Sequence, residues 1–181
     1  MPTYVALLRG VNVGNARRVP MVDLREVLAG LGCTEVATLL NSGNAAFRST
    51  ARSASGCATA IARALADRFG FDVPVVVKSA QELGAIVAGN PLRFTAADHS
   101  RLLVAFMQDA GQLPSLHGLD PLVVPPEQFA VGRHAAYLLC ASGLLESKAA
   151  AALLGKAGQA ATTRNWATVL KLHALALSVG A

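Results

Sequence analysis

Strand-like and helix-like apolar patterns alternate through the first 80 residues in an order that few folds accept. Continuous or alternating apolar runs predict strands, and apolar residues three and four apart predict helices. In chain order, the predicted segments are a strand at 4–8, a helix at 20–32, strands at 36–40 and 45–49, a helix at 55–68 and a strand at 73–78. This β-α-β-β-α-β order indicates the ferredoxin-like arrangement, in which two helices cover one face of an antiparallel sheet.

The turn Gly89-Asn90-Pro91 predicts a division into two halves, residues 1–90 and 91–181, because a helix expected at 80–88 ends before the residue that precedes proline. Beyond it we expect strands at 102–107, 122–124, 128–131 and 134–140, a helix at 144–154, and a final helix capped by Thr162 or Thr163 with an apolar side through Trp166, Val169, Leu170 and Leu177. The expected fold class is therefore α+β with two ferredoxin-like halves, the second a looser variant ending in a helix. No sequence repeat links the halves.

Composition excludes several classes of protein. With 53% hydrophobic residues in 181, the chain is not expected to be disordered. It has no apolar run near the roughly 18 residues that cross a bilayer and no signal-peptide core, so we expect a cytoplasmic protein without a membrane partner. The three cysteines form no close pair and the four histidines show no metal-ligand spacing. We therefore expect a reducing compartment and neither a metal nor a cofactor.

Positive charge is concentrated in one loop. Of the net charge of +5, the first 25 residues contribute four arginines against one aspartate. Most of these lie in the loop 9–18, between the first strand and the first helix, which also carries two glycines and two asparagines. Free backbone amides and guanidinium groups near a helix N-terminus suit an anion. The loop lacks the Walker and dinucleotide-binding signatures, and a loop that uses Gly and Asn only for positive φ is an equal alternative.

Two further polar segments are candidates for the same site. The turn 41–44 is more often only a hairpin, and the segment 162–166 offers hydroxyls, a guanidinium and an amide at an expected helix start. We predict that the three segments converge on a cleft between the halves. The cleft would hold a nucleotide, a phosphorylated metabolite or a nucleic-acid backbone. The predicted anion-binding residues are Arg9, Asn12, Gly14, Arg17, Arg18, Ser42, Asn44, Thr163, Arg164 and Asn165.

Other functions stay open on sequence grounds. An enzyme acting on a phosphate-bearing or acyl substrate would use Arg9 and Arg164 for developing charge and Ser42 as nucleophile, but no base is evident. Cys57, near a helix start, is the one cysteine with a reason for a lowered pKa. A dimeric interaction protein would use a sheet edge or an apolar patch. An RNA-recognition module is disfavoured, since its stacking strands would supply only Tyr4 and Phe47.

Taken together, these motifs resemble the DUF1697 family, a bacterial family of unknown function. The resemblance rests on residues 6–14, 19–21, 41–44 with Phe47, 162–166, 168–169 and 171–172. It implies an α+β structure with two ferredoxin-like halves and no known reaction. The family usually has a further glycine and a lysine-rich stretch where this chain has Asn15, Ala16, Arg17 and Arg18. An anion-holding role survives this exchange, whereas a mechanism that needs a deprotonatable lysine does not.

Overall fold

The computed structural model describes residues 1–181, and the chain divides into two compact units. Unit 1 comprises Met1–Gly84 together with Lys171–Ala181, and unit 2 comprises Ala85–Leu170. The division falls inside a helix, α3 (Ala80–Ala88), rather than at the turn that follows it, and the end of the last helix belongs to unit 1. None of the helices combines the length and apolar character needed to span a membrane.

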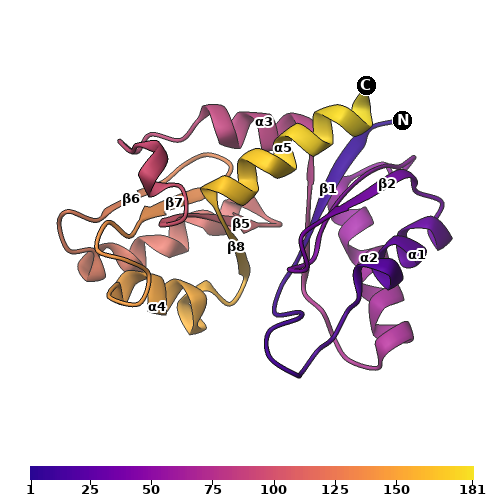
Figure 1. Cartoon of the computed structure of the whole chain (residues 1–181), viewed down its shortest axis with the longest axis horizontal. Coiled ribbons are helices and arrows are strands. Elements are labelled where there is room, and N and C mark those ends of the chain that lie inside the picture. Colours follow the sequence, from indigo (N-terminus) through magenta and orange to yellow (C-terminus); the bar gives the residue numbers. More distant parts are fainter. The chain divides into compact units, whose positions relative to one another are not determined.

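Unit 1 has the predicted β-α-β-β-α-β order. Its elements are β1 (Thr3–Leu8), α1 (Met21–Gly30), β2 (Thr34–Leu39), β3 (Asn44–Arg48), α2 (Ala54–Phe69) and β4 (Val75–Ser79). The four antiparallel strands lie in the order β2-β3-β1-β4, and α1 and α2 lie side by side on one face of the sheet (Figure 1). This arrangement confirms the ferredoxin-like prediction for the first half. Pro20 is the N-cap of α1 and not its first helical residue.

The helix-covered face of unit 1 holds its apolar core. Alternate residues of β1, namely Tyr4, Ala6 and Leu8, pack there with Ile61 and Leu65 of α2. Phe47 of β3 lies on the same side, with its ring centre 6.2 Å from that of Tyr4, and both aromatic side chains are buried. Because an RNA-recognition module stacks bases on exposed aromatic rings, these two residues cannot serve that purpose.

The opposite face of the same sheet is also buried but carries polar groups. Asn44 is 0% exposed, and its side-chain amide donates to Leu39 O (2.9 Å) and to Ser42 Oγ (2.8 Å). Lys78 is 2% exposed, pairs with Val5 in the strand register, and forms an ion pair with Glu82 (3.8 Å). A buried ammonium group is costly unless it is paired, and the ion pair with Glu82 offsets part of this cost. The sequence pattern of the strand gives no sign that Lys78 is buried.

Unit 2 repeats this plan with different elements. β5 (Leu102–Met107), β6 (Gln128–Val131), β7 (Ala136–Leu139) and β8 (Ala161–Asn165) form an antiparallel sheet in the order β6-β7-β5-β8, with α4 (Lys148–Leu154) before β8. The place of a first α-helix is taken by a 3-10 segment, Ala110–Leu122, which contains Pro114 and Pro121. Proline removes a backbone donor and disfavours a regular α-helix. The strand expected at 122–124 does not form, since Leu122 ends this segment.

The strand registers show that the two units are structural duplicates. In unit 1, Val5 of β1 pairs with Lys78 on β4, and in unit 2, Val104 of β5 pairs with Arg164 on β8. The last strand of each sheet, β4 or β8, passes directly into a helix. In each helix, the backbone N–H of the third residue donates to a capping side chain at the end of the strand. Ser79 caps α3 by accepting from Glu82 N (3.1 Å), and Asn165 caps the last helix by accepting from Thr168 N (2.9 Å). The expectation of two ferredoxin-like halves is confirmed, although no repeat is visible in the sequence.

The C-terminal region corrects three sequence predictions. The segment 162–165 is strand β8 and not a helix start, so Thr162 and Thr163 do not cap α5 (Trp166–Gly180). Helix α4 begins only after its N-cap Ser147, which accepts from Ala150 N (3.0 Å), and residues 144–146 precede it. Leu177 is 61% exposed, because the buried side of α5 runs through Trp166, Val169, Leu172, Ala176 and Val179.

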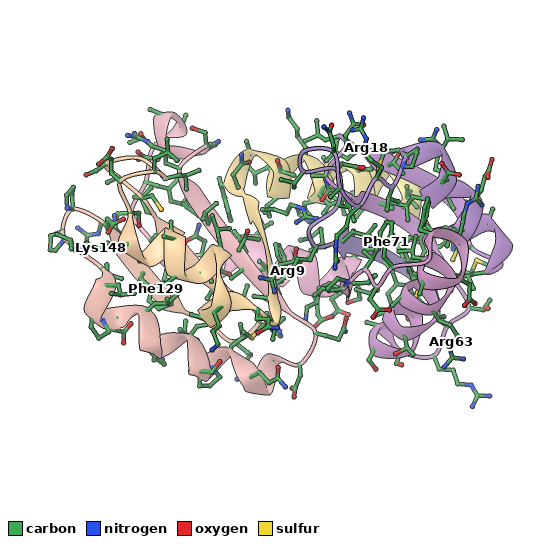
Figure 2. The ribbon with its side chains drawn as sticks, turned by 90° about the horizontal axis from the view of Figure 1, so that it is seen from below. Arg9, Arg18, Arg63, Phe71, Phe129 and Lys148 are labelled. Carbon is green, nitrogen blue, oxygen red and sulfur yellow. The ribbon has the colours of Figure 1, made fainter.

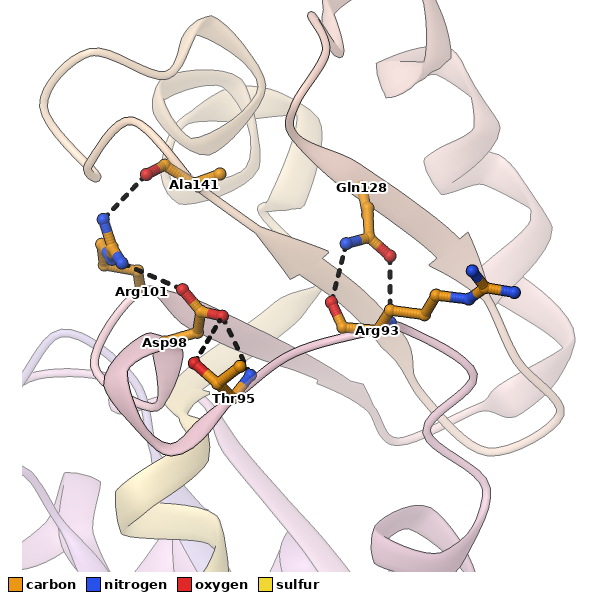
Figure 3. Close-up of polar contacts among 6 residues, drawn as sticks. All are labelled: Arg93, Thr95, Asp98, Arg101, Gln128 and Ala141. Carbon is orange, nitrogen blue, oxygen red and sulfur yellow. Dashed lines mark hydrogen bonds and ion pairs between the residues drawn. The ribbon is translucent and has the colours of Figure 1, made fainter.

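A small polar network precedes β5 in unit 2 (Figure 3). The carboxylate of Asp98 accepts from Thr95 N (3.0 Å) and from Arg101 Nη2 (2.9 Å), while Arg101 Nη1 donates to Ala141 O (2.8 Å). Beside it, the Gln128 side chain exchanges two hydrogen bonds with the backbone of Arg93. The bond from Thr95 N is the main cause that lowers the pKa of Asp98 below its ordinary value of 3.8, with the Arg101 charge as a further cause.

The lowered pKa of Asp98 predicts an acid dependence of stability. A carboxylate with a depressed native pKa stabilises the fold above its ordinary value of 3.8, and this contribution is lost as the pH falls through the native value. Asp98→Asn should therefore lose less stability than the wild type as the pH falls from about 5 to below 3.8. Urea unfolding followed by the fluorescence of Trp166, the single tryptophan, measures this in unit 2. Equal losses in both proteins would contradict the prediction.

Candidate functional site

The loop between β1 and α1 is held in one conformation by Asn12. The side-chain Nδ2 of Asn12 donates to Val19 O (2.8 Å) and to Asn41 O (2.6 Å), and its side-chain Oδ1 accepts from Val19 N (2.8 Å). Asn12 has a φ of 58°, and its backbone N donates to Arg17 O (3.1 Å). Asn12 therefore joins the loop to the hairpin turn, which brings two of the three predicted segments together.

Two arginines of the loop also fasten it to the segment before β4. Arg9 is half-buried, and its backbone N donates to Pro74 O (2.9 Å). Arg17 Nη1 donates to Asp72 O (2.8 Å), and its guanidinium lies 5.9 Å from the centre of the Phe71 ring. This guanidinium is thus directed toward Asp72 and Phe71. Gly14, at φ 64°, is exposed at the tip of the loop.

Arg18 lines a pocket of about 370 Å³ together with Asn12, Pro20, Met21 and Asn41. Its exposed side chain makes no ion pair or hydrogen bond within the chain. The pocket lies at the beginning of α1, where the N-cap Pro20 offers no side-chain cap to the first turn. Arg18 and Phe71 are labelled in Figure 2, where Arg63 extends away from α2. Arg18 and Asn12 were among the predicted anion-binding residues. Pro20, Met21 and Asn41 were not, although all three lie in the motifs that carry the resemblance.

The hairpin turn packs against the end of β1. Leu8 N donates to Gly43 O (2.9 Å), and Gly43 has a φ of 87°. Ser42 is exposed, and its hydroxyl oxygen accepts from the amide of Asn44, a group that cannot act as a general base. Asn44 is buried, as described above, so its side chain stabilises the turn. The amide of Asn44 therefore does not activate Ser42 as a nucleophile.

The third predicted segment lies in strand β8 of unit 2. The guanidinium of Arg164 donates to Thr162 Oγ1 (3.0 Å) and to Thr163 O (2.8 Å), and burial lowers its pKa to about 10. Thr163 is half-buried in the strand, and Asn165 is the N-cap of α5. The premise of a helix-start anion cradle formed by Thr162 and Thr163 is therefore wrong. A role for this segment in a site shared with the first loop stays a prediction.

The cysteines are poor candidates for nucleophiles. All three are buried, at positions 33, 57 and 140. Burial is the main cause that raises the pKa of Cys57 to about 11, and it also raises the pKa of Cys33 and Cys140. The expected helix-dipole effect on Cys57 is outweighed, because removal of the thiol from water disfavours the charged thiolate.

The comparisons with known proteins now assign the family. The model of DUF1697, described as a protein of unknown function, matches residues 1–137. The chain belongs to the DUF1697 family. The match covers the first loop, the pocket residues and the hairpin turn, so the candidate site lies within the family's own region.

A solved structure supports the fold of this DUF1697 member. This chain is similar to the solved structure of the conserved bacterial protein SP0830 from Streptococcus pneumoniae. The TM-score is 0.79 and the sequence identity 23%, and the likeness covers 97% of this chain and 98% of that chain. At this identity the likeness concerns the fold alone. None of the curated proteins compared with the chain matches it.

Proposed function

We propose that this DUF1697 protein binds an anionic ligand in the pocket at the first loop of unit 1. The observation that carries the proposal is the side chain of Arg18, which lines a pocket of about 370 Å³ and has no partner of its own within the chain. A guanidinium without an internal partner is available for a charge-assisted hydrogen bond to phosphate or carboxylate.

The surroundings of Arg18 favour negative charge in the ligand. The first-turn amides of α1 are not capped by a side chain, and the N-terminus of a helix carries partial positive charge. The acidic residues of α1 nearest that end, Asp23 and Glu26, are both ion-paired with Arg68, which offsets their repulsion of an anion. The loop itself is fixed by the side-chain bonds of Asn12 and Arg17, so little ordering is needed on binding.

Arg18→Ala tests the proposal, with Arg63→Ala as the matched control. Both residues are exposed arginines of unit 1, but Arg63 lies on α2, away from the loop (Figure 2). Inorganic phosphate should raise the melting temperature of the wild type and of Arg63→Ala. The dissociation constant of phosphate should be about 10- to 100-fold higher in Arg18→Ala, since a hydrogen bond to a charged group contributes about 1.5–3 kcal/mol. Thermal shift over a phosphate titration measures both. Equal responses of the two variants would overturn this site.

A further inference from the structure

The pocket at Arg18 is larger than a bare anion requires. A volume of about 370 Å³ lies at the lower end of the range of roughly 300–1,000 Å³ that holds organic ligands. Arg18 is the cationic residue of the lining, and the other lining residues are apolar Pro20 and Met21 and the two asparagines Asn12 and Asn41. The following inference rests on the proposed function, because it takes the anion at Arg18 as its starting point.

The apolar wall suits a flat ring. Met21 is half-buried and packs against the core of unit 1, which holds its thioether in place. Thioether sulfur makes favourable contacts with aromatic rings, and the adjacent Pro20 extends the apolar surface. An aliphatic phosphate ester such as a sugar phosphate would leave this wall in contact with hydroxyl groups.

Asn41 offers hydrogen bonds in the same pocket. Its backbone carbonyl is held by the side chain of Asn12 (2.6 Å), so the residue has a fixed position. Its side-chain amide makes no hydrogen bond within the chain. An amide presents both a donor and an acceptor, and this pair matches the edge of a nucleobase.

The charge of the pocket limits the number of phosphates. Arg18 is the single cationic residue of the lining, and the neighbouring Arg17 is directed toward Asp72 and Phe71. A second or third phosphate group would have no guanidinium of the lining to contact. We propose that the pocket binds a nucleoside monophosphate, with the phosphate at Arg18, the base against Met21, and the base edge at the amide of Asn41.

Calorimetric titration of the full chain tests this assignment with adenosine 5′-monophosphate, adenosine 5′-triphosphate, ribose 5-phosphate and inorganic phosphate. The monophosphate should bind at least about 10-fold more tightly than ribose 5-phosphate or inorganic phosphate. The triphosphate should bind no more tightly than the monophosphate. Asn41→Ala should weaken the affinity for the monophosphate by about 3- to 10-fold and leave the affinity for inorganic phosphate unchanged, since only the nucleotide has a base edge to bond. The Asn41 side chain makes no hydrogen bond within the chain, so its loss should not disturb the fold.

The outcomes separate this inference from the proposed function. Equal affinity for all four ligands would overturn the nucleotide assignment and leave anion binding at Arg18 intact. A triphosphate that binds 10-fold or more tightly than the monophosphate would overturn the single-phosphate assignment. If none of the four ligands binds, both the inference and the proposed function are overturned.

Discussion

Gly43→Ala is expected to lower the free energy of unfolding by about 2–4 kcal/mol. Gly43 has a φ of 87°, in the left-handed region where a Cβ is unfavourable. A Cβ there would also lie 2.6 Å from Cβ of Leu8, the last residue of β1, and 3.0 Å from Cγ2 of Val11 in the following loop, and both side chains are buried. Strain and overpacking therefore add at one position. Urea unfolding of the full chain followed by circular dichroism measures the change.

Gly14→Ala is the matched control for this prediction. Gly14 has a similar φ of 64°, but nothing lies within 4 Å of the position that a Cβ would take. This variant should show the backbone strain alone, about 1 kcal/mol. If Gly43→Ala loses no more stability than Gly14→Ala, the close approach of the hairpin turn to Leu8 does not contribute as argued.

Asn12→Ala is the second variant for which we expect a large loss, about 2–4 kcal/mol of unfolding free energy. The substitution removes three side-chain hydrogen bonds, two of them to the backbone of Val19, which is 0% exposed. Buried backbone groups left without partners cost more than the average hydrogen bond contributes. The loop should also lose its attachment to the hairpin turn at Asn41. Urea unfolding measures the stability, and phosphate titration measures the effect on the pocket.

Asn15→Ala serves as its control in the same loop. Asn15 is exposed, and its side chain makes no hydrogen bond within the chain. Its replacement should change stability by less than about 0.5 kcal/mol, as is usual for surface substitutions. A comparable loss in both variants would mean that the loop is not held by the side chain of Asn12.

The candidate site could be predicted from the sequence only in part. The Gly, Asn and Arg residues of the loop indicated the region where the pocket lies, but sequence could not assign separate roles to adjacent arginines. Arg17 donates to Asp72 O, a residue far along the chain, whereas Arg18 faces the pocket. Asn12 lines the pocket, and the structure adds that its side chain holds the loop. These differences depend on contacts between segments that are distant in sequence.

The sequence alone determined the order of strands and helices in unit 1, because apolar periodicity and turn residues act locally. It also indicated the loop in which positive charge gathers. Only the tertiary structure decided that β8 is a strand, since the pairing of Arg164 with Val104 overrides the capping preference of Thr162 and Thr163. The structure also placed Pro20, Met21 and Asn41 around Arg18, and it brought Lys78 and Arg164 to equivalent positions of two duplicate sheets. Burial and strand register are properties of the assembled fold, which no local pattern of residues specifies.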